Sequence, residues 1–149
     1  FYFKCAIGKK GLTLNKKEGD NKTPKGKFGI EHLYYRKDRI RNFSSKLRCI
    51  PISKNMGWCD DKKDKKNYNR KIEDLKKIKH EKLYRKDGLY DLLIPIKYNF
   101  SKPKPGKGSA IFLHLTEKYK PTEGCIAINK NDFLILLRLI NNKTKIIIK

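Results

Sequence analysis

The sequence predicts a mostly β fold with one clear α-helix. Two short apolar runs, 89–99 and 110–115, are flanked by turn formers, as buried strands are. A later run, FLILLRLI at 133–140, follows a helix start signal, because Asn129 and Asp132 have the spacing of a capping box. The chain has 149 residues, the size of one domain, and shows no internal repeat. We therefore expect a single domain over 1–149.

The first half of the chain is expected to consist of strands and loops. Two glycines bracket a turn at 8–11 between FYFKCAIG and LTLN, which predicts a β-hairpin over 1–15. The segment TPKG at 23–26 predicts a turn before a strand that carries Phe28, Ile30 and Leu33. Residues 53–71 have many turn formers and no sustained period, so they are predicted to form a long loop around Trp58.

The second half contains the remaining elements. Residues 70–86 have apolar side chains at 72, 75, 78 and 83, a spacing that indicates a short amphipathic helix. After the helix at 133–140, the segment TKIIIK at 144–149 is expected to close the chain as a strand.

The charge is strongly positive. Lys and Arg number 38 against 15 Asp and Glu, a net charge of +23 that suggests an anionic partner such as an acidic polymer. The lysines are scattered, however, and no basic helix or aromatic-studded basic strand gathers them. A lysine-rich compositional bias is therefore favoured over a specific nucleic-acid site. No apolar run approaches the roughly 18 residues that span a bilayer.

The chain begins with Phe1 rather than Met, which suggests a segment or a processed product whose signal peptide was removed. Its four cysteines have no CxxC spacing and no histidine pair at zinc-finger spacing, which argues against a structural metal. If one cysteine is a nucleophile, at most one disulfide can form among the other three.

A histidine and a cysteine are the first candidates for chemistry. His114 ends an apolar run and Cys125 follows it by 11 residues, so only a fold-back can join them. An imidazole beside a thiol favours the thiolate, and Gly124 would let a substrate carbonyl approach the amide groups of Gly124 and Cys125 as an oxyanion hole. The alternative is a buried cysteine beside an unrelated histidine, which the spacing alone favours.

A wider set of segments shifts the balance. TPKGKF at 23–28, followed by a histidine and then a cysteine in the context T-x-G-C, resembles the L,D-transpeptidase catalytic domain family. Further segments similar to a small branch of this family are GSAIFLH at 108–114, PTEGC at 121–125, GWCDD at 57–61, YNR at 68–70 and LYD…YN within 89–99. The resemblance covers nearly the whole chain.

This resemblance implies a β-sandwich of the L,D-transpeptidase catalytic type and a cysteine acyltransferase of the bacterial cell envelope or periplasm. Cys125 would attack a carbonyl at the diamino-acid residue of a peptidoglycan stem peptide and form a thioester, and His114 would hold the thiolate and later deprotonate an acceptor amine. Amide groups near Gly124 would stabilise the oxyanion. No cofactor and no metal would be needed, and a monomer is expected.

The motif departs from the family at one position. The family has a histidine two residues before the cysteine, where this chain has Glu123 after Thr122. An ionised Glu123 would oppose thiolate formation, or it would point outward and bind the amine of a peptide. Ala127 stands where the family usually has a basic or amide side chain.

Other candidates for the substrate groove come from the loops. In the long loop, carboxylates would meet the diamino-acid ammonium and an arginine would meet a carboxylate, the candidates being Trp58, Asp61, Tyr68, Asn69 and Arg70. In the alternative, Trp58 belongs to the core and the acids are solvated. Asn99 and Ser109 flank the histidine strand and are candidates to orient the imidazole.

Three secondary expectations remain. His80 and Glu81 join the site only if they do not lie on an exposed helix face, which is the favoured interpretation. An oxidising compartment would permit a disulfide between Cys5 and Cys59. Two rival functions stay open beside transpeptidation: a carboxypeptidase or amidase that uses the same cysteine, and a non-catalytic basic module that binds anionic wall polymer.

Overall fold

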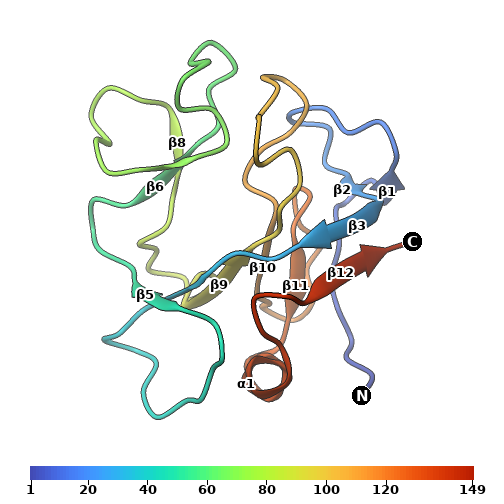
Figure 1. Ribbon diagram of the computed structural model, residues 1–149, viewed down its shortest axis with the longest axis vertical. Helices are drawn as coiled ribbons and strands as arrows, with labels where there is room; N and C mark the ends of the chain where they lie inside the picture. Colours follow the sequence, from blue (N-terminus) through green and yellow to red (C-terminus); the bar gives the residue numbers. More distant parts are fainter.

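The computed structural model describes residues 1–149 and is mostly β (Figure 1). Its strands form one five-stranded sheet and three small sheets, and its one α-helix lies against the five-stranded sheet. The elements are β1 Leu12–Thr13, β2 Thr23–Pro24, β3 Gly26–Gly29, β4 Leu33–Tyr35, β5 Cys49–Pro51, β6 Gly57–Cys59, β7 Lys71–Ile72, β8 His80–Lys82, β9 Leu92–Pro95, β10 Phe112–Leu115, β11 Ile126–Ile128, α1 Lys130–Leu139 and β12 Lys145–Ile148.

The five-stranded sheet has the order β11-β10-β9-β4-β5 and is the centre of the molecule. β10 pairs in parallel with β11 and antiparallel with β9, while β4 pairs antiparallel with β9 and in parallel with β5. Every residue of β9, β10 and β11 is buried, which explains why these strands are continuous apolar runs rather than alternating ones. Both faces of this part of the sheet are therefore covered.

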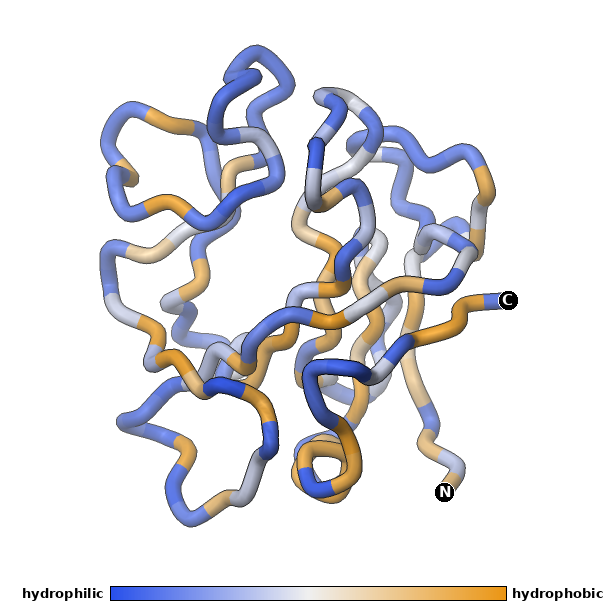
Figure 2. Tube along the Cα trace, viewed as in Figure 1, coloured by the Kyte–Doolittle hydropathy of each residue, from blue (hydrophilic) through white to orange (hydrophobic).

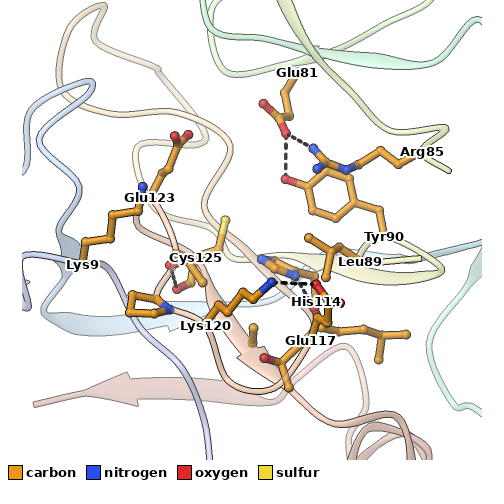
Figure 3. A pocket seen from close by; sticks show the side chains of 15 residues that line it. Lys9, Glu81, Arg85, Leu89, Tyr90, His114, Glu117, Lys120, Glu123 and Cys125 are labelled. Atoms are coloured by element: carbon orange, nitrogen blue, oxygen red, sulfur yellow. Dashed lines mark hydrogen bonds and ion pairs between the residues drawn. The ribbon is translucent and has the colours of Figure 1, made fainter. Parts of the chain in front are cut away.

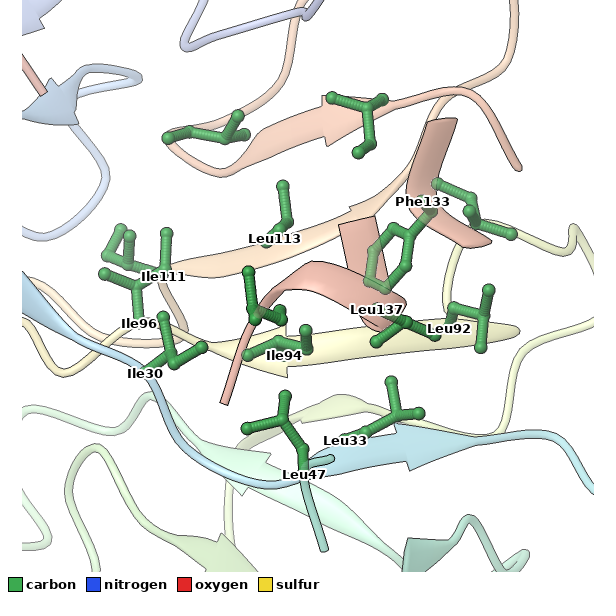
Figure 4. Close-up of a cluster of buried hydrophobic side chains, with 14 of the residues drawn as sticks. Ile30, Leu33, Leu47, Leu92, Ile94, Ile96, Ile111, Leu113, Phe133 and Leu137 are labelled. Atoms are coloured by element: carbon green, nitrogen blue, oxygen red, sulfur yellow. The ribbon is translucent and has the colours of Figure 1, made fainter. Parts of the chain in front are cut away.

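Two hydrophobic clusters cover these faces. On one face Leu113 and its neighbours pack against Phe133 and Leu137 of α1 (Figure 4). On the other face Phe112 packs with Trp58 of β6, their rings edge to face with centroids 5.3 Å apart. Figure 2 shows the same partition, with the hydrophobic segments in the central strands and the helix and the hydrophilic ones in the outer loops. This two-sided core confirms the expected β-sandwich class.

The predicted helix, its cap and the final strand are confirmed. Asn129 is the N-cap, and its side-chain oxygen accepts a hydrogen bond of 2.9 Å from the Asp132 N–H. The Asn129 amide also donates to the Asp132 carboxylate at 2.5 Å, so the two side chains hold each other. β12 then pairs antiparallel with β3 and carries the predicted strand character of the C-terminal segment.

The predicted N-terminal hairpin is wrong. The turn itself forms, with the Gly11 N–H donating to the Gly8 carbonyl at 2.9 Å, but the two flanking segments pair elsewhere. Ala6 bridges Ala127 next to the sheet edge, and β1 pairs in parallel with β2. The free edge of β11 offers the first segment long-range backbone partners that the short local hairpin does not match.

The predicted helix at 70–86 is also wrong. β7 and β8 lie in this region, on either side of β6 in an antiparallel three-stranded sheet. Of the four apolar residues that suggested a helix face, Ile72 and Leu83 are buried while Leu75 and Ile78 are only half-buried. The spacing of three was therefore coincidental, because strand pairing with β6 decides which side chains are covered.

All four cysteines are free thiols, so the expected disulfide between Cys5 and Cys59 does not form. Cys5 is exposed on the N-terminal segment, where its neighbour Ala6 bridges Ala127, whereas Cys59 is buried in β6, which pairs with β7 and β8. Strand pairing thus holds the two cysteines in different parts of the fold. None of the helices in the structure has the length and apolarity needed to cross a bilayer.

Candidate active site

A cavity of about 280 Å³ opens beside the strands β10 and β11 (Figure 3). It is the cavity that contains both His114 and Cys125. Its walls come from the β8–β9 region, from the end of β10 and from the turn before β11. The lining residues are Lys9, Glu81, Arg85, Leu89, Tyr90, His114, Leu115, Thr116, Glu117, Lys120, Pro121, Thr122, Glu123, Cys125 and Ala127.

Parallel pairing brings the histidine and the cysteine to one face of the sheet. His114 lies opposite Ala127 in the β10–β11 register, and Leu113 lies opposite Ile126. Because side chains alternate along a strand, Leu113 and Ile126 point into the helix-side core, while His114 and Cys125 point to the other face. The turn at 116–124 thus makes the predicted fold-back.

Cys125 is buried and its sulfur is held by two backbone groups. The thiol donates to the Ala110 carbonyl at 3.2 Å, and the sulfur accepts the Phe112 N–H at 3.4 Å. Burial raises the pKa of the Cys125 thiol to about 12, and the charges of Glu81 and Glu123 act in the same direction. The Phe112 N–H and Lys16 oppose this increase but do not overcome it. At neutral pH the Cys125 thiol is therefore protonated.

His114 is a neutral base in the same site. Its Nδ1 lies 2.8 Å from the Leu115 carbonyl, which can only accept, so Nδ1 carries the hydrogen and Nε2 keeps a free lone pair. Burial lowers the pKa of His114, and nearby Arg85 lowers it further. The Tyr90 ring packs edge to face on the imidazole at 5.2 Å. The group that orients this imidazole is thus the Leu115 carbonyl, not Asn99 or Ser109.

The turn before Cys125 requires glycine at position 124. Gly124 has φ +146°, and a Cβ there would lie 2.9 Å from the Lys22 carbonyl oxygen. The Thr122 hydroxyl accepts the Gly124 N–H at 3.1 Å and donates to the Cys125 carbonyl at 2.6 Å. The Gly124 amide is therefore occupied, whereas the Cys125 N–H donates to no protein acceptor. Of the two amides expected to form an oxyanion hole, the Cys125 N–H is the free one.

A polar cluster forms the wall opposite this turn. One oxygen of Glu81, Oε1, accepts the Tyr90 hydroxyl at 2.9 Å and the Arg85 guanidinium at 3.0 Å. Arg85 also lies over the Tyr90 ring, 4.8 Å from its centroid, and is paired with Asp87. Burial raises the pKa of Tyr90, so its hydroxyl remains a hydrogen-bond donor to Glu81.

The sequence analysis missed this polar cluster because it predicted an exposed helix over 70–86. Glu81 belongs to the site after all, whereas His80 does not line the cavity: its Nδ1 lies 2.6 Å from the Ile78 carbonyl. Arg85 and Tyr90 were not anticipated. The only available signal was the cluster of charged and aromatic residues before a buried strand.

None of the long-loop candidates lines this cavity, and two of them, Tyr68 and Asn69, belong to a buried hydrogen-bond network. Asn69 makes four hydrogen bonds: its Oδ1 accepts the Trp58 indole N–H and the Ala110 N–H, and its Nδ2 donates to the Tyr98 and Asn99 carbonyls. These bonds hold the 98–110 segment, whose Ala110 carbonyl accepts the hydrogen bond from the Cys125 thiol. Asn69 therefore holds the segment that contacts the Cys125 sulfur and does not line the cavity of Cys125.

The other members of this network have the same role. The hydroxyls of Tyr68 and Ser109 both donate to Glu18, and the Tyr68 oxygen accepts the Gly108 N–H. The Asn99 amide donates to two carbonyls of its own loop, those of Lys104 and Gly108. The polar groups of these side chains bond to backbone atoms and to the Glu18 carboxylate, and none of these side chains lines the cavity of Cys125.

The other loop candidates also lie away from the cavity of Cys125. Trp58 is a core residue, 3% exposed, as the alternative interpretation held. Asp61 accepts the Lys63 N–H within a turn, whereas Arg70 lines a second cavity together with Trp58 and Asn69. Thr122 and Glu123, by contrast, line the cavity of Cys125 as expected.

Comparison with known proteins identifies a family. The family model of the L,D-transpeptidase catalytic domain (YkuD) matches residues 1–148. None of the curated proteins and none of the solved structures gives a significant match to the chain. The matched residues, 1–148, include the TPKGKF segment, the His114 strand and the T-x-G-C turn. The chain therefore belongs to the L,D-transpeptidase catalytic domain family.

Proposed function

We propose that the protein is a peptidoglycan L,D-transpeptidase of the bacterial cell envelope, that it acts as a monomer, and that Cys125 is its nucleophile. The observation that carries this proposal is the arrangement of Cys125 and His114 on one face of paired strands, at a single cavity. The imidazole lone pair and the free Cys125 N–H supply a base and an oxyanion donor beside the thiol. The family itself consists of cysteine-dependent enzymes that cross-link peptidoglycan.

The first half of the reaction forms an acyl-enzyme. As the Cys125 sulfur attacks the carbonyl carbon of the stem-peptide diamino-acid residue, His114 Nε2 takes the thiol proton. The carbonyl oxygen becomes an oxyanion next to the Cys125 N–H. When the tetrahedral intermediate collapses, the C–N bond breaks, His114 returns the proton to the leaving amine, and a thioester remains on Cys125.

The second half reverses these proton transfers. An acceptor amine attacks the thioester carbonyl, His114 removes a proton from that amine, and the C–S bond breaks as the new amide forms. The Cys125 thiolate then recovers the proton from His114. If water attacks in place of the amine, the same residues release a free acid, so transfer and hydrolysis differ only in the second nucleophile.

The proton must move during attack because the resting thiol and imidazole are both neutral. A preformed thiolate–imidazolium pair, as first expected, is opposed by the burial of both groups. The neutral resting groups therefore favour a mechanism in which His114 acts as a general base over one that starts from a permanent thiolate–imidazolium pair.

Intact-mass spectrometry tests the proposal. Wild type, Cys125→Ala and Cys49→Ser are each incubated with a purified disaccharide tetrapeptide and, separately, with a carbapenem. We expect a covalent adduct on wild type and on Cys49→Ser, whose substituted cysteine is exposed and outside the cavity, and none on Cys125→Ala. Cross-linked dimers among the products would indicate transfer, and shortened monomers alone would indicate the carboxypeptidase. The absence of any adduct on folded, reduced wild type would contradict the enzyme assignment.

The net charge of +23 supports an additional affinity for anionic wall polymer. Such binding would be salt-sensitive and would survive Cys125→Ala, because it depends on surface lysines. Co-sedimentation of both forms with polymer-bearing walls at increasing salt distinguishes it from recognition at the catalytic cavity.

A further inference from the structure

The cavity of Cys125 differs in charge from the rest of the molecule. Basic residues outnumber acidic ones 38 to 15 in the chain, yet the cavity is lined by three acids and three bases. One pair, Glu117 and Lys120, neutralises itself at 3.3 Å on the exposed rim. The charges that face the thiol are therefore those of Glu81, Glu123, Arg85 and Lys9.

The Glu81 carboxylate is held in place through one oxygen, and its other oxygen accepts no hydrogen bond. Its Oε1 accepts two hydrogen bonds, from Tyr90 and Arg85, while its Oε2 has no hydrogen-bond partner. Arg85 is shared with Asp87, which takes its Nε and one terminal nitrogen. Glu81, Arg85 and Asp87 together therefore carry one net negative charge, and the free Glu81 oxygen is an acceptor at the cavity wall.

Glu123 supplies the second carboxylate from the opposite side. It is exposed, lines the cavity from the turn before Cys125, and takes part in no ion pair or hydrogen bond. In Figure 3 the Cys125 sulfur points toward the side of the cavity where the Glu81 and Glu123 carboxylates lie. Both carboxylates also act on the thiol, since each raises its pKa.

From this arrangement we propose that Glu81 and Glu123 form a cation-recognition site beside Cys125, which binds an ammonium group and makes the sulfur a better nucleophile once that group is bound. A bound cation neutralises the two charges that oppose ionisation of the thiol. If the proposed function holds, the group recognised is the side-chain ammonium of the donor diamino-acid residue. Cys125 would then be activated by the correct donor and stay protonated without it.

The other charged groups around the thiol set the sign of each test. Lys16, buried behind the Gly124 turn, is paired with Asp20 and does not line the cavity. Lys9 lines the cavity near Glu123 and has no ion-pair partner, so it competes with an incoming cation. Arg85 is held by Glu81 and Asp87, and His114 is neutral. Removal of Lys9 should strengthen cation recognition, and removal of either glutamate should weaken it.

Charge-selective thiol labelling tests this proposal without any peptidoglycan. The protein carries Cys5→Ser and Cys49→Ser, which remove the two exposed thiols, while Cys59 stays buried. It is treated with 2-aminoethyl methanethiosulfonate, a cation, or with 2-sulfonatoethyl methanethiosulfonate, an anion. In both reactions the Cys125 thiolate attacks the sulfenyl sulfur, a disulfide forms, methanesulfinate leaves, and the thiol proton passes to solvent. Rates are measured by intact mass and divided by the rates of the same reagents with 2-mercaptoethanol.

We expect the normalised rate for the cation to exceed that for the anion roughly tenfold, as two nearby opposite charges allow. The net charge of +23 would favour the anion instead, so a cation-to-anion ratio above one can come only from the local charges at the cavity. An ionic strength of about 0.15 M limits that long-range field to about 8 Å. Glu81→Gln and Glu123→Gln should each lower the ratio about threefold, and Lys9→Met should raise it.

The double variant Glu117→Gln/Lys120→Met is the matched control, because the two residues line the same cavity as an ion pair and their joint removal leaves its net charge unchanged, so its ratio should not change. Glu123 is exposed, so Glu123→Gln keeps the proposal testable even if Glu81→Gln does not fold. A ratio at or below one, or a ratio that neither glutamine variant lowers, would overturn the cation site. A charge-selective Cys125 that forms no adduct with tetrapeptide or carbapenem would instead retain the site and overturn only the transpeptidase assignment.

Discussion

Replacement of Asn69 by alanine separates a scaffold role from a substrate contact. The Asn69 side chain is buried and makes four hydrogen bonds, at 2.8, 3.0, 3.1 and 2.7 Å. Asn69→Ala leaves the Trp58 indole, one amide and two carbonyls without these partners. Each buried group that loses its partner costs about 1 to 3 kcal/mol, and water entering the space left by the side chain recovers part of this. We therefore expect a loss of about 3 kcal/mol.

Asn69 also has φ 55°, where alanine is less favourable than asparagine, and a matched variant measures this contribution alone. Asn42 has φ 56° and is exposed, and its side chain makes no hydrogen bond, so Asn42→Ala reports only the backbone cost. For a chain of this size 1 kcal/mol corresponds to about 2 to 4 °C, so Asn69→Ala should lower Tm about 6 to 12 °C more than Asn42→Ala. Circular dichroism melting measures both.

The outcome that refutes this reasoning is specific. Asn69→Ala and Asn42→Ala could have the same Tm while Asn69→Ala is acylated more slowly or with a higher KM. Asn69 would then contact substrate, and its hydrogen bonds would not stabilise the fold. If stability falls as expected, the remaining folded protein should also label more slowly at Cys125 than Asn42→Ala does, because the 98–110 segment no longer holds the Ala110 carbonyl against the sulfur.

The other predictions concern the turn, the thiol, the imidazole and the wall. Gly124→Ala should lower Tm more than Gly19→Ala, because a Cβ at 124 meets a backbone carbonyl at 2.9 Å whereas one at 19 meets nothing within 4 Å; equal losses would contradict the close approach. The rate of Cys125 alkylation by iodoacetamide should keep rising with pH above about 9, the range of an ordinary thiol, since its pKa is raised to about 12; a plateau at neutral pH would indicate a preformed thiolate. Because the folded pKa of His114 is lowered, the unfolded chain binds more protons as the pH falls below about 6.5, so urea titrations at pH 7 and 5 should show wild type losing more stability than His114→Gln. Tyr90→Phe should lower the free energy of urea unfolding by about 1 kcal/mol, because the hydrogen bond to Glu81 is lost. It should keep more acylation activity than Tyr90→Ala, which also removes the ring that packs on His114. Equal activities of the two variants would show that this ring does not position the imidazole.

Local signals in the sequence were sufficient for the elements whose conformation depends on residues close to one another in the chain. The capping residues Asn129 and Asp132 start the helix through contacts within four residues, and the buried runs at 92–95 and 112–115 have no alternative to a covered sheet. The placement of His114 and Cys125 at one cavity was not decided by local signals, because their spacing alone favoured a buried cysteine beside an unrelated histidine. The resemblance carried by the T-x-G-C motif and the other family segments is what predicted it.

Long-range pairing decided the rest, because strand partners that are distant in sequence leave no local periodicity. The segment at 70–86 has helical spacing, yet β6 draws its two ends into a sheet and thereby places Glu81 and Arg85 on the cavity wall. The ionisation of Cys125 and the hydrogen bonds of the Asn69 side chain likewise depend on burial and on partners 11 to 41 residues away. The sequence alone thus identified the family and predicted Cys125 and His114 as the candidate nucleophile and base. The charges that surround the sulfur follow from tertiary packing instead, since electrostatic effects depend on distance in space and not along the chain.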